Sequence, residues 1–154
     1  MVRYREATTS DIPELVRLRV EFLSDIQHDA VHRDAAALRE ALLGYFTEGM
    51  KDNGYIAWLA VDDGTIVATS GLSFLVFPPS FRNPTGRVAY IMNMYTLPAY
   101  RRRGIGSALF EKMIDEARRR GYGKLSLHAT EMGRSLYARY GFKDEKKEMV
   151  LRLQ

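Results

Sequence analysis

The chain contains no cysteine, no internal repeat and no long apolar run. Without cysteine, a disulfide framework, an iron–sulfur cluster, a thiolate zinc site and a cysteine nucleophile are all excluded. The longest apolar runs, such as residues 55–61, are far too short to cross a bilayer, and residues 1–6 lack the apolar stretch of a secretory signal. These absences predict a cytoplasmic protein that has no redox or thiol chemistry and no membrane partner.

Length and composition fit one globular domain. The 154 residues, with a mass of 17.6 kDa, suffice for a single core and are too few for two domains of usual size, so we expect one domain over residues 1–154. Hydrophobic residues make up 46% and charged residues 27%, which argues against disorder. The net charge of +4 is a mild bias toward an anionic ligand and does not by itself indicate nucleic-acid binding.

Hydrophobic periodicity and turn residues predict an alternation of strands and helices. Residues 62–65, Asp-Asp-Gly-Thr, mark a hairpin turn, and two X-Pro steps followed by a glycine make residues 78–86 a loop. The predicted strands are 2–7, 55–61, 66–77, 87–96 and 124–129, with one or two more from residue 142 onward, and the predicted helices end near residues 23, 50, 120 and 140. This order predicts an α/β fold with a mixed, mostly antiparallel sheet and helices on both faces.

Local patterns predict details of the first two helices. An Asp11/Glu14 capping-box spacing and an early proline mark the start of the first helix within residues 8–14. In the second helix, from about residue 34, the spacing predicts which side chains are buried. These are Leu38, Ala41, Leu42 and Tyr45.

The segment 96–110 carries the clearest chemical signal. It joins a predicted strand to a predicted helix, and Gly104 and Gly106 remove side chains where a ligand can approach the backbone. The unpaired N–H groups of a helix N-terminus attract phosphate, and three arginines at 101–103 add positive charge just before it. The alternative is a solvated basic loop with two turn glycines. A Walker phosphate loop is excluded because no Gly-Lys-Ser/Thr follows, and the third glycine of a dinucleotide fingerprint is missing.

The motif around these glycines resembles a known family signature. Arg101-x-x-Gly104-x-Gly106 is similar to the Arg/Gln-x-x-Gly-x-Gly/Ala signature of the GNAT-type N-acetyltransferases. Residues 97–101, Leu-Pro-Ala-Tyr-Arg, resemble the family's lead-in, and residues 136–142, Leu-Tyr-Ala-Arg-Tyr-Gly-Phe, resemble its C-terminal segment. Since the predicted order of elements also matches, the resemblance covers essentially the whole chain and implies the acyl-CoA N-acyltransferase fold.

By this resemblance, the chain is expected to transfer an acetyl group from acetyl-CoA to an amine that attacks the thioester directly. Backbone N–H groups of residues 102–107 would hold the CoA pyrophosphate, as the helix N-terminus independently indicates. The main chain of residues 95–97 would pair with the pantetheine arm and polarise the thioester carbonyl. The residues expected at the cosubstrate are Tyr95, Thr96, Leu97, Arg101, Arg102, Arg103, Gly104, Ile105, Gly106 and Ser107.

Tyr137 is the expected general acid. It lies four residues before Gly141, at the position whose tyrosine in the family sits near the sulfur and can protonate the leaving thiolate. The alternative is a core tyrosine that only packs on a short amphipathic helix. Seven residues earlier, where the family often has an asparagine, this chain has Thr130, so that contact with CoA is in question.

The general base is not assigned by the sequence. Strand 87–96 has no carboxylate, and Asn93 can orient a water or the amine but cannot accept its proton. Glu21 is one substitute, although an i,i+4 pair with Arg17 is an alternative role for it. His128 has a suitable titration range, although it can equally be structural, and a water chain to solvent needs no residue at all.

Acidic residues in the connection after the first helix bear on the acceptor. Asp25, Asp29 and Asp34 lie in a segment that often lines the acceptor pocket in this family, which favours a small cationic amine, whereas the alternative is a solvated loop. His28 and His32 have His-x-x-x-His spacing, but the usual glutamate is missing and no third ligand is evident, so no metal is expected.

The sequence leaves rival functions open. The acceptor could instead be a protein lysine or N-terminus, or the chain could be a CoA-binding module without activity. No nucleic-acid partner is expected, because the basic run 118–120 is interleaved on one helix with the acidic residues Glu111, Asp115 and Glu116. Family members are often homodimers, yet nothing in the sequence marks an interface.

Overall fold

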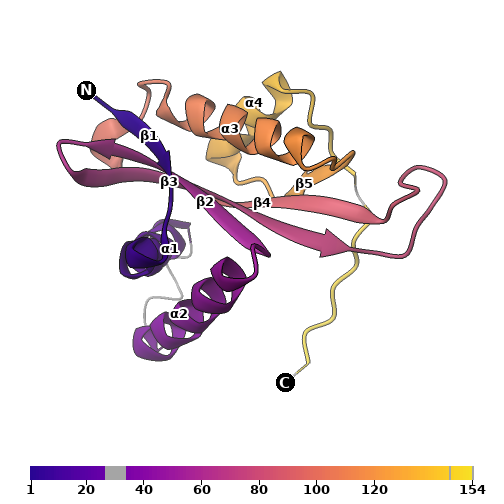
Figure 1. The fold of residues 1–154 in the computed structure, drawn as a ribbon, viewed down its shortest axis with the longest axis horizontal. Helices are drawn as coiled ribbons and strands as arrows, with labels where there is room; N and C mark the ends of the chain where they lie inside the picture. Colours follow the sequence, from indigo (N-terminus) through magenta and orange to yellow (C-terminus); the bar gives the residue numbers. More distant parts are fainter. Residues whose placement is uncertain (27–33, 146, 154) are drawn as a thin grey trace.

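The computed structural model describes residues 1–26, 34–145 and 147–153. Figure 1 shows a central sheet with helices packed on it. The strands are β1 Arg3–Glu6, β2 Tyr55–Asp62, β3 Thr65–Val76, β4 Arg87–Thr96 and β5 Leu125–Leu127; the helices are α1 Ile12–Ile26, α2 Ala35–Lys51, α3 Ile105–Arg119 and α4 Glu131–Arg139.

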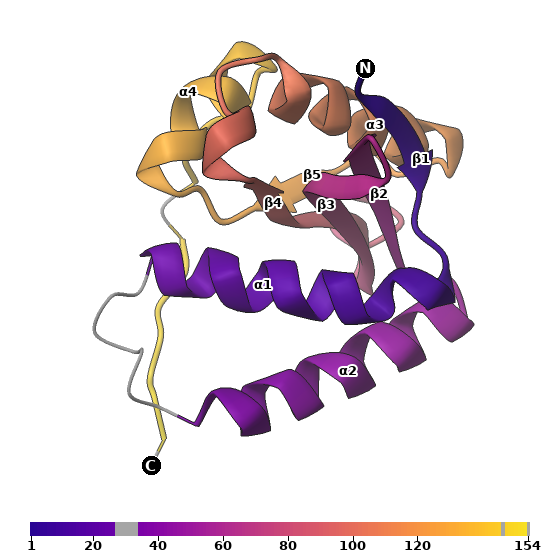
Figure 2. The same ribbon diagram turned by 90° about the vertical axis from the view of Figure 1, so that its left-hand side faces the viewer.

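The sheet confirms the predicted fold class. Its strands lie in the order β1-β2-β3-β4-β5; the first four are antiparallel, whereas β5 runs parallel to β4 after the crossover through α3. Helices α1 and α2 lie on one face and α3 and α4 on the other (Figure 1, Figure 2). The fold is therefore a mixed, mostly antiparallel α/β layer structure, as the sequence predicts.

Each face of the sheet has its own apolar core. On the α1 and α2 face, Leu18, Phe46 and Leu59 are almost completely buried, and on the α3 face Phe110 and Met113 are. Full burial of a side chain of this size contributes about 1.5–3 kcal/mol each. Because both faces are covered in this way, the ends of the strands, rather than the faces, remain available for a site.

A bulge in β4 determines where the sheet opens. Gly71 of β3 is opposite Met92, whereas Thr69 is opposite Tyr95, so β4 contains an extra residue between these pairs. Within this bulge Asn93 has a φ of 56°, which is uncommon for a residue with a side chain. The extra residue bends β4 near its carboxyl end.

The parallel pair β4 and β5 is short. Only Ala89 to Ile91 pair with Leu125 to Leu127, and the pairing stops just before the bulge. Beyond this point no described residue pairs with the free side of β4. The two strands separate at their carboxyl ends, which is where α/β sheets bind ligands.

The start of α1 differs from the prediction. The capping box is Thr8 with Asp11, one turn earlier than the predicted Asp11/Glu14 pair, and a short 3-10 turn at Thr9–Asp11 precedes the helix. Both carboxylate oxygens of Asp11 accept hydrogen bonds from Arg5, at 2.7 Å each. The arginine on β1 therefore selects which acid caps the helix, and local spacing does not reveal this contact.

Of the four side chains predicted to be buried on α2, Leu42 packs against the core, whereas Leu38, Ala41 and Tyr45 are exposed. Phe46 is buried, whereas Leu38 is 37% and Tyr45 is 44% exposed. Leu42 and Met50 pack against the same core, so the apolar stripe repeats every four residues around Phe46. Leu38 lies one turn too early in the helix to reach the sheet.

The predicted strands from residue 142 onward are wrong for the described residues. Residues 142–145 and 147–153 contain no strand, and the segment runs away from the sheet (Figure 1). Met149, Leu151 and Leu153 alternate with other residues as in a strand but are more than 80% exposed. Their pattern fits a strand, but none of the described residues pairs with them to form one.

Candidate active site

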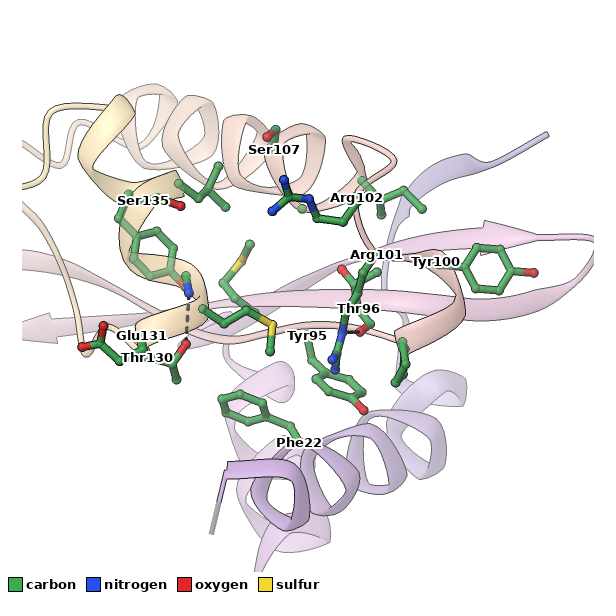
Figure 3. Close-up of a pocket in the computed structure, with 18 of the residues that line it drawn as sticks. Phe22, Tyr95, Thr96, Tyr100, Arg101, Arg102, Ser107, Thr130, Glu131 and Ser135 are labelled. Carbon is green, nitrogen blue, oxygen red and sulfur yellow. Dashed lines mark hydrogen bonds between the residues drawn. The ribbon is translucent and has the colours of Figure 1, made fainter. Parts of the chain in front are cut away.

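A pocket of about 1490 Å³ opens where β4 and β5 separate. This is larger than the usual ligand pocket of about 300–1,000 Å³ and can accommodate a long cosubstrate. Its walls come from the end of α1, the end of β4, the start of α3 and the length of α4 (Figure 3). The predicted residues that line it are Tyr95, Thr96, Arg101, Arg102, Gly104, Ile105, Gly106, Ser107 and Tyr137.

The upper wall of the pocket is the N-terminus of α3. Gly104 caps the helix with a φ of 78°, and Arg102 adopts a φ of 64°, so the chain makes a tight left-handed turn into the helix. A Cβ at Gly106 would meet only Leu136, at 3.9 Å, so the open space in front of it faces the pocket. The N–H groups of the first helical turn lack intrahelical partners, which makes this end suited to a phosphate.

The three arginines of the basic run have different positions. The Arg101 Nε donates to the Thr96 carbonyl at 2.9 Å and its guanidinium pairs with Asp25 at 3.1 Å, so it secures the end of β4. Arg102 lies beside Ser107, whereas Arg101 turns toward Tyr95 (Figure 3). Arg103 stacks over the Tyr100 ring and does not line the pocket.

Tyr137 lines the pocket from α4 and is 8% exposed. Its phenol lies against Gly133, where a Cβ would be 2.7–2.8 Å from two ring carbons and the hydroxyl oxygen, and its ring packs on Phe110 with centroids 5.2 Å apart. Among the described residues its hydroxyl has no hydrogen-bond partner. Burial raises the pKa of Tyr137, so the phenol keeps its proton at neutral pH.

The main chain at the end of β4 is only partly available. Tyr95 and Thr96 line the pocket, but the Leu97 N–H donates to the Val67 carbonyl at 2.9 Å. The Leu97 carbonyl in turn accepts from the Tyr100 N–H at 2.8 Å. Both main-chain groups of Leu97 are therefore occupied, and Leu97 does not line the pocket.

The two predicted bases, Glu21 and His128, do not line the pocket, and neither does Asn93, which was expected to orient a water or the amine. Glu21 forms the ion pair with Arg17, at 2.9 Å, and also accepts from the Tyr95 hydroxyl at 3.3 Å. The His128 ring is largely exposed; its Nδ1 is bonded to the Tyr90 hydroxyl and its Nε2 lies 3.1 Å from Glu148. Buried Asn93 donates to the Tyr55 hydroxyl at 3.0 Å.

Of the three acidic residues predicted in the connection after the first helix, Asp25 lies instead in the last turn of α1 and lines the pocket. It accepts from the Tyr95 hydroxyl at 2.9 Å, and burial together with this bond raises the pKa of Tyr95. Asp34 instead caps α2 by accepting from the N–H groups of residues 36 and 37. Asp29, His28 and His32 lie outside the described residues.

The described residues also bear on metal binding, on membrane spanning and on the basic run at residues 118–120. Within residues 1–26, 34–145 and 147–153, His, Asp and Glu side chains form no group of three or more that could hold a metal ion. In the same part of the chain, no helix is both long and apolar enough to span a membrane. In the basic run 118–120, each arginine pairs with an acid on its own helix, either Asp115 or Glu116.

Sequence reasoning missed two residues of the site. Phe22 of α1 forms part of the pocket floor (Figure 3), and Arg139 of α4 donates to the Ser107 hydroxyl at 3.4 Å. Phe22 belongs to the apolar side of α1, so the sequence pattern alone indicates a core residue. Arg139 lies beside the start of α3 only because α4 packs along it, and no local pattern signals that contact. Thr130 caps α4, accepting from the Gly133 N–H at 3.3 Å.

Comparisons with known proteins agree with this geometry. The chain matches the Acetyltransferase (GNAT) family over residues 15–142. It is 24% identical over 148 residues to the thialysine N-epsilon-acetyltransferase of Mus musculus, covering 91% of this chain and 81% of that protein. A predicted acetyltransferase of Clostridium acetobutylicum, solved with acetyl-CoA, has a TM-score of 0.90 at 34% identity and covers 99% of this chain and 96% of its own. A GCN5-related N-acetyltransferase of Ralstonia eutropha JMP134 has a TM-score of 0.87 at 30% identity, covering 99% of each chain.

The fold and the pocket define the class of protein, an N-acetyltransferase. The chain belongs to the acetyltransferase (GNAT) family, as the signature at residues 101–106 indicates.

Proposed function

We propose that the protein transfers the acetyl group of acetyl-CoA to the amine of a small molecule. The observation that carries this proposal is one continuous pocket that joins the N-terminus of α3, the open end of β4 and the Tyr137 phenol. These are the parts that a phosphate-bearing thioester substrate needs: an anion site at one end and a proton donor at the other.

The residues present fit acetyl-CoA. The first-turn N–H groups of α3, with Arg102 and Arg139 beside them, would hold the pyrophosphate. The free side of β4 at Tyr95 and Thr96 would pair with the pantetheine arm, as a neighbouring strand would. Arg101 would act indirectly, by securing the Thr96 carbonyl.

Acetyl-CoA supplies a thioester, whose C–S bond breaks as the amine nitrogen forms the new C–N bond. A main-chain N–H at the bulged end of β4 would stabilise the oxyanion that develops on the carbonyl, and donors of this kind contribute about 3 kcal/mol each. Tyr137 would give its hydroxyl proton to the departing thiolate and regain one from water. The amine proton would leave through water in the pocket, since neither Glu21 nor His128 lines it.

The charge beside the pocket favours a cationic amine. Asp25 lines the pocket, and Glu21 shares the Tyr95 hydroxyl with it; each of these carboxylates is also paired with an arginine, Asp25 with Arg101 and Glu21 with Arg17. The carboxylate of Asp25 would attract an ammonium group before it loses its proton. We propose a small amine as the acceptor rather than a protein lysine or N-terminus.

A thermal-shift titration tests the cosubstrate first. Acetyl-CoA and CoA are expected to raise the Tm saturably and pyrophosphate much less, because a ligand at 100 times its Kd adds about 2.7 kcal/mol of stability. A panel of small amines and lysine peptides, followed by thiol release, then tests the reaction. Binding without thiol release would favour a CoA-binding module, and release with peptides alone would favour a protein acceptor. A cytoplasmic location stays a prediction from the sequence.

A further inference from the structure

Arg19 is a half-buried cation on the face of α1 that turns toward the sheet. It lies one turn before Phe22, which lines the active-site pocket, and its guanidinium carbon is 5.4 Å from the centre of the Phe22 ring. Arg19 therefore lies next to the pocket, on the side opposite the α3 N-terminus.

The charge of Arg19 is not neutralised by its own helix. Glu14 and Glu21 pair with Arg17, and Asp25 pairs with Arg101. Within residues 1–26, 34–145 and 147–153, Arg19 forms neither an ion pair nor a hydrogen bond. Burial holds its pKa below the usual value, so the surrounding protein disfavours the charge rather than stabilising it.

The surroundings of Arg19 are hydroxyl groups. Tyr45, Tyr55 and Tyr90 lie within electrostatic range of the guanidinium. The Tyr45 hydroxyl is 2.6 Å from that of Ser73, and the Tyr90 hydroxyl is bonded to His128. Within the described residues none of these hydroxyls bonds to the guanidinium, so its N–H donors are available for an anion.

Glu148, an acid of the C-terminal segment, is already engaged. Glu148 acts electrostatically on Tyr90, but its carboxylate lies 3.1 Å from the His128 Nε2. It is 66% exposed at the side chain, so water screens its charge. Glu148 therefore does not supply the partner that Arg19 lacks.

We propose that Arg19 binds a carboxylate of the acceptor substrate, so that the acceptor is an amine that also carries an acid group. This inference rests on the proposed function and specifies its substrate class. The amine would lie beyond Phe22 at the pocket, and the carboxylate one helical turn away, at a rise of about 4.5 Å. The planar guanidinium fork matches the two oxygens of a carboxylate, and one such cation balances one negative charge.

Matched acids and amides test the proposal. The substrates are 4-aminobutanoate and 6-aminohexanoate, each compared with its carboxamide, which has the same length and no charge. The wild-type protein is expected to prefer at least one of the acids over its amide in kcat/KM by about ten-fold or more, as the loss of a charged hydrogen bond implies. Arg19→Gln is expected to remove that preference by raising the KM of the acid, while the rate with the amide changes less than two-fold.

Two further variants control the result. Arg39→Gln removes an exposed arginine from α2 and is expected to leave the preference for the acid intact. Arg19→Lys keeps the charge but not the fork and is expected to retain part of it, which covers the case in which Arg19→Gln does not fold. A wild-type protein that treats acid and amide alike, or an Arg19→Gln variant that keeps the preference, overturns the proposal.

Direct binding separates this proposal from the proposed function. If no amine is acetylated, the same four compounds are titrated calorimetrically into the CoA-saturated protein. Tighter binding of the acid to wild type than to Arg19→Gln supports the carboxylate site even then, and equal binding refutes it. Failure of acetyl-CoA itself to bind is scored separately in the thermal-shift titration and would count against the proposed function alone.

Discussion

Gly133 and Tyr137 lie one turn apart on α4, and the smaller residue determines where the larger one can lie. The phenol ring occupies the space that a Cβ at position 133 would take. Phe110 closes the other side, so the ring is held between α3 and the previous turn of its own helix. The hydroxyl thereby reaches the pocket from a mostly buried position.

Tyr137→Phe removes only that hydroxyl. We expect kcat to fall by about 100-fold or more, because the thiolate loses its proton donor, while the KM for acetyl-CoA changes little. Steady-state kinetics with a saturating amine measure both values. Unchanged kcat would leave Tyr137 with a packing role only.

Gly133→Ala keeps the phenol but displaces it. The added Cβ would lie 2.7–2.8 Å from two ring carbons and the hydroxyl oxygen of Tyr137, so the phenol has to shift, and we expect kcat to fall about ten-fold or more. Gly44→Ala is the matched control: nothing lies within 4 Å of its Cβ, and it should stabilise α2 by up to about 1 kcal/mol without changing kcat. Equal activity of both variants would contradict the assigned position of Tyr137.

Among the helices, α3 has two roles: its N-terminus lies at the pocket, and its apolar side packs on the sheet. Gly106→Glu tests the first role, since a Cβ there meets only Leu136 at an ordinary distance and the fold can accept it. We expect the Kd for acetyl-CoA to rise about 100-fold, because a carboxylate would face the phosphates. Gly123→Glu adds the same charge where nothing lies within 4 Å and should leave the Kd unchanged. Titration calorimetry of the two variants compares them directly.

The link between β1 and α1 makes stability depend on pH. The hydrogen bonds from Arg5 lower the pKa of Asp11 from 3.8 to about 2. Because the folded state holds this carboxylate in its charged form, its contribution is fully present above about pH 4 and is lost as the pH falls toward 2. Asp11→Asn should therefore cost about 2 kcal/mol at pH 7 and much less at pH 2.5, as denaturant unfolding at the two values would show. Glu14→Gln, which breaks an exposed pair, should cost under about 1 kcal/mol at either pH.

The elements that the sequence predicts well are those with a local cause. The glycines and the hairpin turn at residues 62–65 each act within a few residues, so the α3 N-terminus was located correctly. The buried stripe of α2 and the cap of α1 were predicted incorrectly, because Phe46 and Asp11 are selected by contacts with other elements. For the same reason the sequence could not show that Arg101 secures Thr96, that Arg139 reaches Ser107, or that Arg19 lacks an acid.

At the scale of the whole molecule, the C-terminal segment is the part that packs least. Val150 and Leu151 are 64% and 83% exposed, and the outer edge of β5 has no partner among the described residues. We expect a second copy of the chain to cover them, forming a homodimer. A segment with alternating apolar residues and the open edge of a strand pair readily.

Leu151→Asp should then shift the protein from dimer to monomer in light scattering after size exclusion. Phe81→Asp changes another fully exposed apolar residue, in the loop between β3 and β4, and should leave the mass unchanged. A wild-type protein that is monomeric at all concentrations would contradict the expected homodimer.

The separation of β4 and β5 also has a dynamic consequence. A strand with a partner on only one side is held by half of the usual hydrogen bonds, so the end of β4 should open locally at a lower free energy than the cores on either face of the sheet. The proposed cosubstrate would pair along this end as a temporary strand and would stabilise it against local opening. In a cell the lifetime of the protein against proteolysis would then follow the supply of acetyl-CoA.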